Sequence, residues 1–240
     1  MQEPVIVENQ NLDSRLEELV RFGVHFGYAK TRRHPRMRNF IAGVKSNIEI
    51  FYVEKVSECL QKALEYIEQV GKEKGVILWV GTKPAASEYI SALALELGHP
   101  YVNARWIGGT LTNYKIIRER IAYWQSLLSK QKSGELAKYT KQEQLQIQRE
   151  VDRLTRSFDG LVSLTAIPRA LFIVDTNEES SALREARLKK ISTVALLNTD
   201  CDPLGASFPI PGNDNSPKSI SFILDKVKEA YLKGKENAGD

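Results

Sequence analysis

Val-Ile-Leu-Trp-Val-Gly-Thr-Lys-Pro, at residues 76–84, is the stretch of the chain that says most about its fold. The five apolar residues 76–80 suit a strand buried on both faces, which is typical of parallel sheets. Pro84 fits the first turn of a helix, where its missing N–H group costs nothing. That helix is expected to reach Leu97, with Gly98 as its stop. The stretch therefore predicts a strand, a tight turn and a helix.

The same pattern returns further along the chain. Apolar runs that predict strands lie at residues 101–102, 170–174, 193–197 and 208–210, and Pro217 marks the start of a final helix. Strands that alternate with helices, and that are apolar throughout, indicate a doubly wound sheet. The sequence therefore predicts an α/β fold, Rossmann-like (flavodoxin-like), with a mostly parallel sheet.

Capping signals and periodicity place further elements. Residues 48–53 are rich in β-branched and aromatic side chains and predict a strand, and a helix follows to Gly71. Ser14 and Glu17 have the spacing of a capping box and predict the start of the first helix. Thr176 and Glu179 have the same spacing and predict the start of another.

Residues 105–166 contain no strand pattern. Apolar residues recur at helical spacing over 117–128 and again over 147–158, with a polar connection between them. This predicts an antiparallel helical coiled-coil hairpin inserted into the α/β domain, which would then comprise residues 1–104 and 167–240. The alternative is that these are two more packed helices of the core.

The segment from Lys30 to Arg38, called the basic segment below, holds five cations and no acidic residue. They are Lys30, Arg32, Arg33, Arg36 and Arg38. Arginine pairs with phosphate through two parallel N–H groups, and lysine supplies a point charge. The segment has no clear period, and we expect a mobile positive surface that suits nucleic-acid phosphates. The alternative is a solvated loop.

Other polar residues are weaker candidates. Lys83 stands where a helix N-terminus follows a buried strand, which suits an anion, but a capped turn explains it equally well. Arg105 lies beside Trp106 and a glycine pair at the expected base of the hairpin. Asp175 ends a strand at the edge where α/β enzymes place their sites, although Asp-Thr-Asn is also simple capping chemistry.

Composition excludes several classes of protein. The net charge of +4 permits nucleic-acid binding without implying it. Cys59 and Cys201 form no C-x-x-C pair, and the three histidines have no metal-ligand spacing. G-x-S-x-G, Walker and G-x-G-x-x-G motifs are absent. No apolar run spans a membrane, and residues 1–11 lack a basic leader, so we expect a cytoplasmic protein or one made inside an organelle.

Several motifs together resemble the family of bacterial-type small-subunit ribosomal protein S-two. In chain order they are Gly23 to Tyr28 with the basic segment, Val80 to Lys83, Arg105 to Asn113, Ile167 to Asp175, Asn198 to Pro203 and Ile210 to Asp214. The chain departs from the family pattern at Tyr28, where a second histidine is usual, and at Arg169, where aspartate is usual.

The resemblance implies a Rossmann-like domain with an inserted coiled-coil hairpin. It also implies a place between the head and the body of the small subunit, in contact with small-subunit rRNA. Family members help to dock ribosomal protein S-one in many bacteria, and the sequence leaves open whether that protein is a partner here.

We therefore expect a structural ribosomal protein and not an enzyme, with no cofactor, metal, membrane contact or small-molecule substrate. The expected partners are rRNA and neighbouring ribosomal proteins, in the ribosome of the cytoplasm or of an organelle. The residues expected to bind rRNA are Lys30, Arg32, Arg33, Arg36, Arg38 and Lys45, followed by Lys83, Arg105 and Lys115. One alternative is an enzyme that binds a phosphorylated small molecule near Thr82 and Asp175, and another is a stand-alone RNA-binding regulator.

Overall fold

The computed structural model describes the backbone of residues 6–238 and the side chains of residues 14–136 and 138–238. Among these residues, five parallel strands form the central sheet, in the order β5-β4-β6-β7-β8. The strands are β4 Ile77–Val80, β5 Tyr101–Val102, β6 Ala170–Val174, β7 Ser192–Leu197 and β8 Phe208–Pro211. Counted along the chain from β4, this order is 2-1-3-4-5, which is that of flavodoxin-like doubly wound sheets. The predicted α/β class with a mostly parallel sheet is confirmed.

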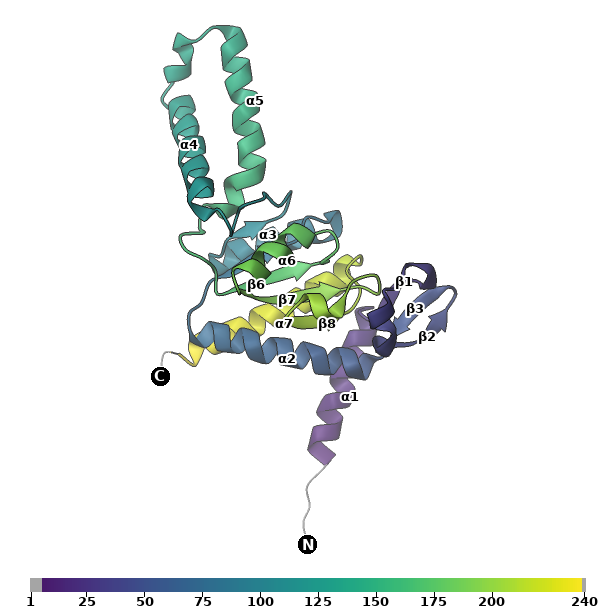
Figure 1. Ribbon diagram of the computed structural model, residues 1–240. Helices are drawn as coiled ribbons and strands as arrows, with labels where there is room; N and C mark the ends of the chain where they lie inside the picture. Colours follow the sequence, from purple (N-terminus) through teal and green to yellow (C-terminus); the bar gives the residue numbers. More distant parts are fainter. Residues whose placement is uncertain (1–5, 239–240) are drawn as a thin grey trace.

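Helices cover both faces of the sheet (Figure 1). One face carries α2 Val53–Lys72, α3 Pro84–Leu97 and α7 Pro217–Glu236, and the other carries α6 Ser180–Leu188. Alternate residues of each strand point to opposite faces of the sheet, so a hydrophobic core lies on each face. Trp79 packs on Phe172 in the core beneath α2, α3 and α7, and Leu78 belongs to the core on the α6 face. This two-sided burial explains why the strands are apolar throughout.

A second sheet, which the sequence predicted only in part, lies beside the central one (Figure 1). It is antiparallel, with the order β1-β3-β2, and its strands are β1 Phe26–Ala29, β2 Ile41–Lys45 and β3 Ile48–Phe51. Only β3 was predicted. β1 and β2 are short and contain Gly27 and Gly43, and neither has the alternation of polar and apolar residues that marks a strand.

Gly27, in β1, lies against the loop that follows β7. A Cβ atom at this position would come within 2.4 Å of the Thr199 Cγ2 atom, so no larger residue fits without a shift. The small sheet is thereby pressed against the loop that follows β7.

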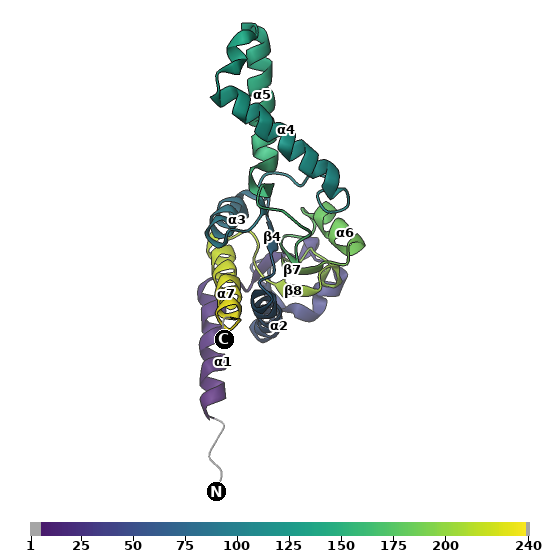
Figure 2. The same cartoon turned by 90° about the vertical axis from the view of Figure 1, so that its left-hand side faces the viewer.

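Residues 105–166 contain two helices, α4 Tyr114–Lys132 and α5 Lys141–Phe158, in agreement with the predicted pair. The two helices contact each other and point away from the central sheet (Figures 1 and 2). Trp124 is buried between them and donates a hydrogen bond from Nε1 to Thr155 Oγ1 at 3.1 Å. A capping box of Thr140 and Glu143 begins α5. Supercoiling of the pair stays a prediction.

Two helix starts differ from the prediction. α1 spans Ile6–Arg21, so Ser14 lies within this helix and not at its start. Serine and glutamate three residues apart are also neighbours on one helix face, and the spacing alone does not fix a terminus. α6 begins at Ser180, because the Asp175 carboxylate accepts from the Asn177 N–H group and holds the preceding residues in a turn.

Both edges of the central sheet are short or blocked. β5 has two residues, and β8 contains Pro209 and Pro211. The Gly212 N–H group donates to the Leu197 carbonyl, and N–H directions alternate along a strand, so both prolines occupy the positions that would donate outward. No helix within residues 6–238 has the length and apolar character needed to span a bilayer.

Candidate nucleic-acid interface

The basic segment is an ordered surface and not the mobile stretch that its lack of period predicted. It forms two short 3-10 helices, Lys30–Arg32 and Pro35–Phe40, the second of which continues two residues past Arg38. Thr199 holds the backbone just before the segment and at its middle, since its hydroxyl accepts from the Tyr28 N–H group at 3.0 Å and its carbonyl accepts from the His34 N–H group at 2.8 Å. Met37 anchors the second turn in the core, where its side chain is fully buried.

The cations of the basic segment have different surroundings. Lys30, Arg32, Arg36 and Arg38 are exposed. Arg36 forms a surface ion pair with Asp202 at 2.6 Å, which an RNA phosphate could replace at little cost.

Arg33 is partly withdrawn from the surface. It pairs at 3.2 Å with Glu49, whose side chain is fully buried. Burial raises the pKa of the Glu49 carboxyl, and Arg33 opposes that rise. Arg33 therefore has a structural role, the neutralisation of the buried Glu49 carboxylate, besides any contact with phosphate.

The remaining predicted residues lie in three places. Lys45 is exposed at the end of β2, the strand that follows the basic segment. Lys115 is exposed in the first turn of α4, and Arg105 is exposed in the loop between β5 and α4. Figure 1 shows α4 well away from the small sheet of β1, β2 and β3. Lys83 lies at the start of α3, with its side chain mostly buried. The fold therefore gathers the basic segment and Lys45 but keeps Arg105 and Lys115 apart from them.

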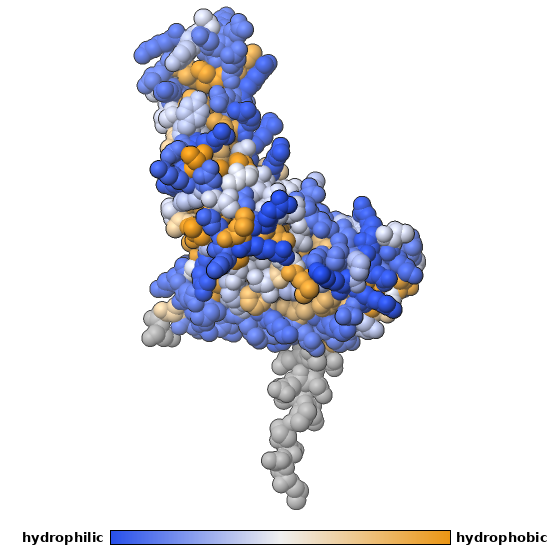
Figure 3. Space-filling view, viewed as in Figure 1, coloured by the Kyte–Doolittle hydropathy of each residue, from blue (hydrophilic) through white to orange (hydrophobic). Residues whose placement is uncertain are grey.

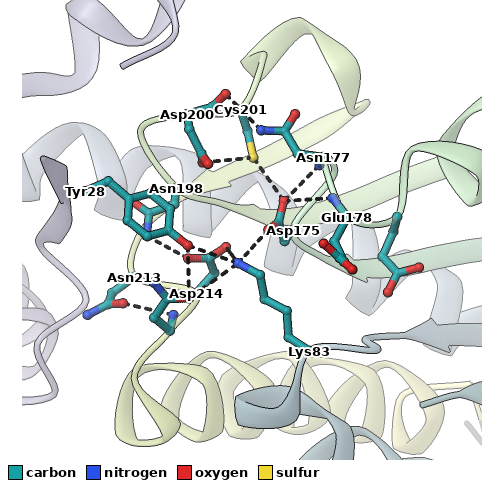
Figure 4. A network of polar contacts seen from close by, with 12 residues as sticks. Tyr28, Lys83, Asp175, Asn177, Glu178, Asn198, Asp200, Cys201, Asn213 and Asp214 are labelled. Carbon is teal, nitrogen blue, oxygen red and sulfur yellow. Dashed lines mark hydrogen bonds and ion pairs between the residues drawn. The ribbon is translucent and has the colours of Figure 1, made fainter. Parts of the chain in front are cut away.

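Lys83 is the centre of a polar network at the carboxyl ends of the parallel strands (Figure 4). Its Nζ atom lies 2.5 Å from Asp175 Oδ2, 2.6 Å from Asp214 Oδ2 and 3.2 Å from the Tyr28 hydroxyl. Lys83 follows β4, Asp175 follows β6 and Asp214 follows β8. Parallel topology alone brings these three residues together, because the strands all end at one edge.

Geometry assigns charge to each member of the network. Both Asp214 oxygens accept from groups that only donate, the Asn198 amide at 2.6 Å and Lys83, so this side chain is a carboxylate. Burial raises its pKa, and Lys83 opposes the rise. Burial also opposes charge on Lys83, but Asp214 and then Asp175 outweigh burial and raise the pKa of Lys83. Burial likewise opposes charge on Asp175, but Lys83 outweighs burial and lowers the pKa of that carboxyl.

The position at which the alternative enzyme would bind phosphate is occupied by the chain itself. The Thr82 N–H group, at the start of α3, donates to Glu179 Oε1 at 2.8 Å. Asp175 is held by Lys83 and the turn before α6. A phosphorylated ligand would have to displace a carboxylate from Thr82 and then meet the negative charge of Asp175.

Glu185, on α6, holds the loop that precedes α4, and nothing in the sequence analysis predicted this role. Its carboxylate accepts four hydrogen bonds from the loop at residues 109–112 and one from the Trp106 indole, at 2.7 to 3.0 Å. Burial raises the pKa of this carboxyl, but these donors outweigh burial and lower it. An acidic residue between Ala182 and Ala186 on the buried face of α6 was the available signal.

A second concentration of positive charge lies outside the basic segment. Residues 105–166 hold eleven Lys and Arg against six Asp and Glu, a net of +5, while the whole chain carries +4. On α5, Arg149, Arg153 and Arg156 are exposed at a spacing that places them on one helix face. Figure 3 shows the mostly hydrophilic surface of this region.

Among the side chains that the structure describes, no three His, Cys, Asp or Glu residues are grouped so that they could hold a metal ion. Cys201 is buried with its Sγ atom 3.4 Å from Asp175 Oδ1, and burial raises its thiol pKa to about 12, so the thiol is protonated.

Comparison with known proteins identifies relatives over nearly the whole chain. A family model described as Ribosomal protein S2 matches residues 19–234. The small ribosomal subunit protein uS2 of Coprothermobacter proteolyticus is 38% identical over 221 residues, which is 92% of this chain and 82% of that protein. The protein of the same name from Marinobacter nauticus is 37% identical over 224 residues, covering 93% and 90% of the two chains.

Proposed function

The chain belongs to the ribosomal protein S2 family, and from this premise we propose that it is a structural constituent of the small ribosomal subunit that binds rRNA between head and body. The family is one of structural, non-enzymatic proteins. Both relatives named above are small ribosomal subunit proteins. The match to this chain covers more than four fifths of the length of each. The partners are then small-subunit rRNA and neighbouring ribosomal proteins.

The ordered basic segment is the observation that carries the rRNA-binding part of the proposal. It presents Lys30, Arg32, Arg36 and Arg38 to solvent from a backbone fixed by Thr199. Preorganised cations bind phosphate without the entropic cost of ordering a loop. Arg33 and Lys45 extend the same surface, and Arg105 and Lys115 lie at a second contact near the hairpin.

The finer architecture belongs to the same proposal. We take residues 105–166 as an inserted coiled-coil hairpin on a Rossmann-like domain formed by residues 1–104 and 167–240. The position of the molecule is in the ribosome, in the cytoplasm of a bacterium or in an organelle. Docking of ribosomal protein S-one is a further proposal that follows from the family resemblance.

Replacing Lys30, Arg32 and Arg38 together by Ala tests the interface without exposing a buried carboxylate, which replacement of Arg33 would do. Binding to small-subunit rRNA should weaken, and the slope of log K against log salt should fall by about 2 to 3 because three phosphate contacts are lost. The matched control replaces Lys62, Lys189 and Lys235, which are exposed on α2, after α6 and on α7.

Sucrose-gradient sedimentation reads the same variants in assembled particles. The unsubstituted protein should travel with small subunits through moderate salt washes, and the interface variant should be depleted from them. An unchanged salt slope together with unchanged incorporation would remove the basic segment from the interface. Binding to rRNA without co-sedimentation would favour the stand-alone regulator instead.

A further inference from the structure

We infer that Lys83 is a positioning residue, which fixes the basic segment through Tyr28 and does not itself contact RNA phosphate. The inference deepens the proposed function and rests on it for the role of the basic segment in RNA binding. It replaces the expectation that Lys83 is one of the phosphate contacts. Three observations carry it: the saturation of its ammonium group, the charge around it and its link to Tyr28.

The ammonium group of Lys83 has no donor left for a ligand. An ammonium carries three N–H donors, and Asp175, Asp214 and the Tyr28 hydroxyl lie 2.5, 2.6 and 3.2 Å from Nζ. The Lys83 side chain is 15% exposed, and those of Asp175 and Asp214 are 6% and 0% exposed. A phosphate could approach only by separating a buried ion pair.

The charge around Lys83 also disfavours phosphate. Both carboxylates are ionised, as their hydrogen bonds require, so the cluster carries a net charge of −1. The field at its surface repels an anion. The basic segment in contrast has a surplus of positive charge at the surface.

Tyr28 connects this cluster to the basic segment. Its hydroxyl accepts from Lys83 and donates to Asn215 Oδ1 at 3.0 Å, while its backbone N–H group donates to Thr199. The Arg32 guanidinium carbon lies 4.9 Å from the centre of the Tyr28 ring, within the range of a cation–π contact. Lys83 therefore fixes the Tyr28 ring, which lies beside it in Figure 4, and Arg32 rests on that ring.

Tryptic cleavage of the full-length protein tests the positioning role without RNA. Lys83→Met should speed cleavage after Lys30 to Arg38 by about tenfold or more, because local opening then costs less. Tyr28→Phe removes only the hydroxyl link and should give a smaller increase in the same direction. Lys228→Met, which breaks the exposed pair with Glu96, should leave cleavage there unchanged.

Cleavage after Lys138, between α4 and α5, is the internal reference. If Lys83→Met unfolds the whole protein, cleavage at both places rises, and Tyr28→Phe then decides the matter. A basic segment that is cleaved at the unsubstituted rate in Tyr28→Phe and in any folded Lys83→Met protein overturns the inference.

Binding to small-subunit rRNA over a salt series separates positioning from contact. A positioning role predicts that Lys83→Met binds about tenfold more weakly, with the salt slope unchanged, because the phosphate-contacting cations are all still present. A direct contact predicts a slope lower by about 0.7 to 0.9 with unchanged cleavage, and this result would overturn the inference. If the unsubstituted protein shows no salt-dependent binding, the proposed function fails, while the cleavage experiment still decides the role of Lys83.

Discussion

Glu185 lies on α6 with its carboxylate turned into the loop at residues 109–112, where five donors surround it. Backbone N–H groups in such a concavity are the arrangement that binds phosphate in many proteins. Here the chain fills it with its own carboxylate. The Trp-Ile-Gly-Gly-Thr-Leu-Thr motif at residues 106–112 is thus explained by internal packing, with no ligand required.

Glu185→Gln should lower the free energy of unfolding by about 3 kcal/mol. The groups around this side chain are all donors, and the amide NH2 group of glutamine cannot accept from them. Urea unfolding followed by fluorescence measures this, with the exposed Glu229→Gln as control. The Glu185 pKa is lowered in the folded state, so its stabilising effect is present above the unfolded pKa and is lost as pH falls through the folded pKa. A variant as stable as the control would contradict the assigned role.

His99 gives the second prediction at this scale. Its Nδ1 atom accepts from the Trp79 indole at 3.2 Å, so the ring proton is on Nε2, which faces the Tyr231 hydroxyl at 3.1 Å. Burial, and then Lys235, lower its pKa to about 4. The neutral ring is therefore the form that fits.

Because the folded pKa of His99 lies below the unfolded value, stability should fall as pH drops below about 6.5. Between pH 8 and pH 5 the loss due to His99 is about 2 kcal/mol. Thermal unfolding across this range measures it. His99→Asn keeps an acceptor near Trp79 but does not titrate, and it should lose less stability over the same interval. An equal loss in both proteins would assign the effect to other groups.

At the scale of elements, the sequence predicted those strands whose signal lies in a run of consecutive residues. The apolar runs at 76–80, 170–174 and 193–197 became β4, β6 and β7, because a strand covered on both faces needs apolar residues throughout. β1 and β2 were missed because their stability comes from pairing with β3 and from the close approach of Gly27 to Thr199. These contacts join residues that are distant in the sequence, so no short stretch of sequence predicts them.

The helices α4 and α5 contact each other and point away from the central sheet, so we expect the pair to open as a unit. Trp124→Ala removes the buried ring and its hydrogen bond to Thr155, at a cost of about 3 to 5 kcal/mol. Hydrogen exchange should accelerate in both helices while β6 and β7 stay protected. The neighbouring exposed Tyr123 supplies the control variant, Tyr123→Ala. Equal acceleration throughout the chain would show that the pair is part of the main cooperative unit.

At the scale of the whole molecule, the candidate interface was predictable only where charge is local in sequence. The basic segment has five cations within nine residues, so the local sequence was enough to single it out. Lys83, Asp175 and Asp214 are separated by up to 131 positions, and only the parallel topology brings them together. Glu185 and its loop are 73 to 79 positions apart and were hidden for the same reason.

The two basic regions should act independently, since they lie on different elements and share no partner in the described structure. Replacing Arg149, Arg153 and Arg156 by Gln should weaken rRNA binding. Combined with the Lys30, Arg32 and Arg38 substitutions, the losses in binding free energy should add within about 0.5 kcal/mol. Filter binding at fixed salt measures all four proteins. A coupling larger than about 1 kcal/mol would indicate that the RNA bridges both regions as one surface.

The prolines of β8 bear on the protein before it reaches any partner. Open sheet edges recruit foreign strands and start the ordered growth that leads to amyloid. Pro209 and Pro211 remove the outward donors from one edge, and the two residues of β5 leave little to pair with at the other. The central sheet therefore offers a foreign strand few groups to pair with at either edge.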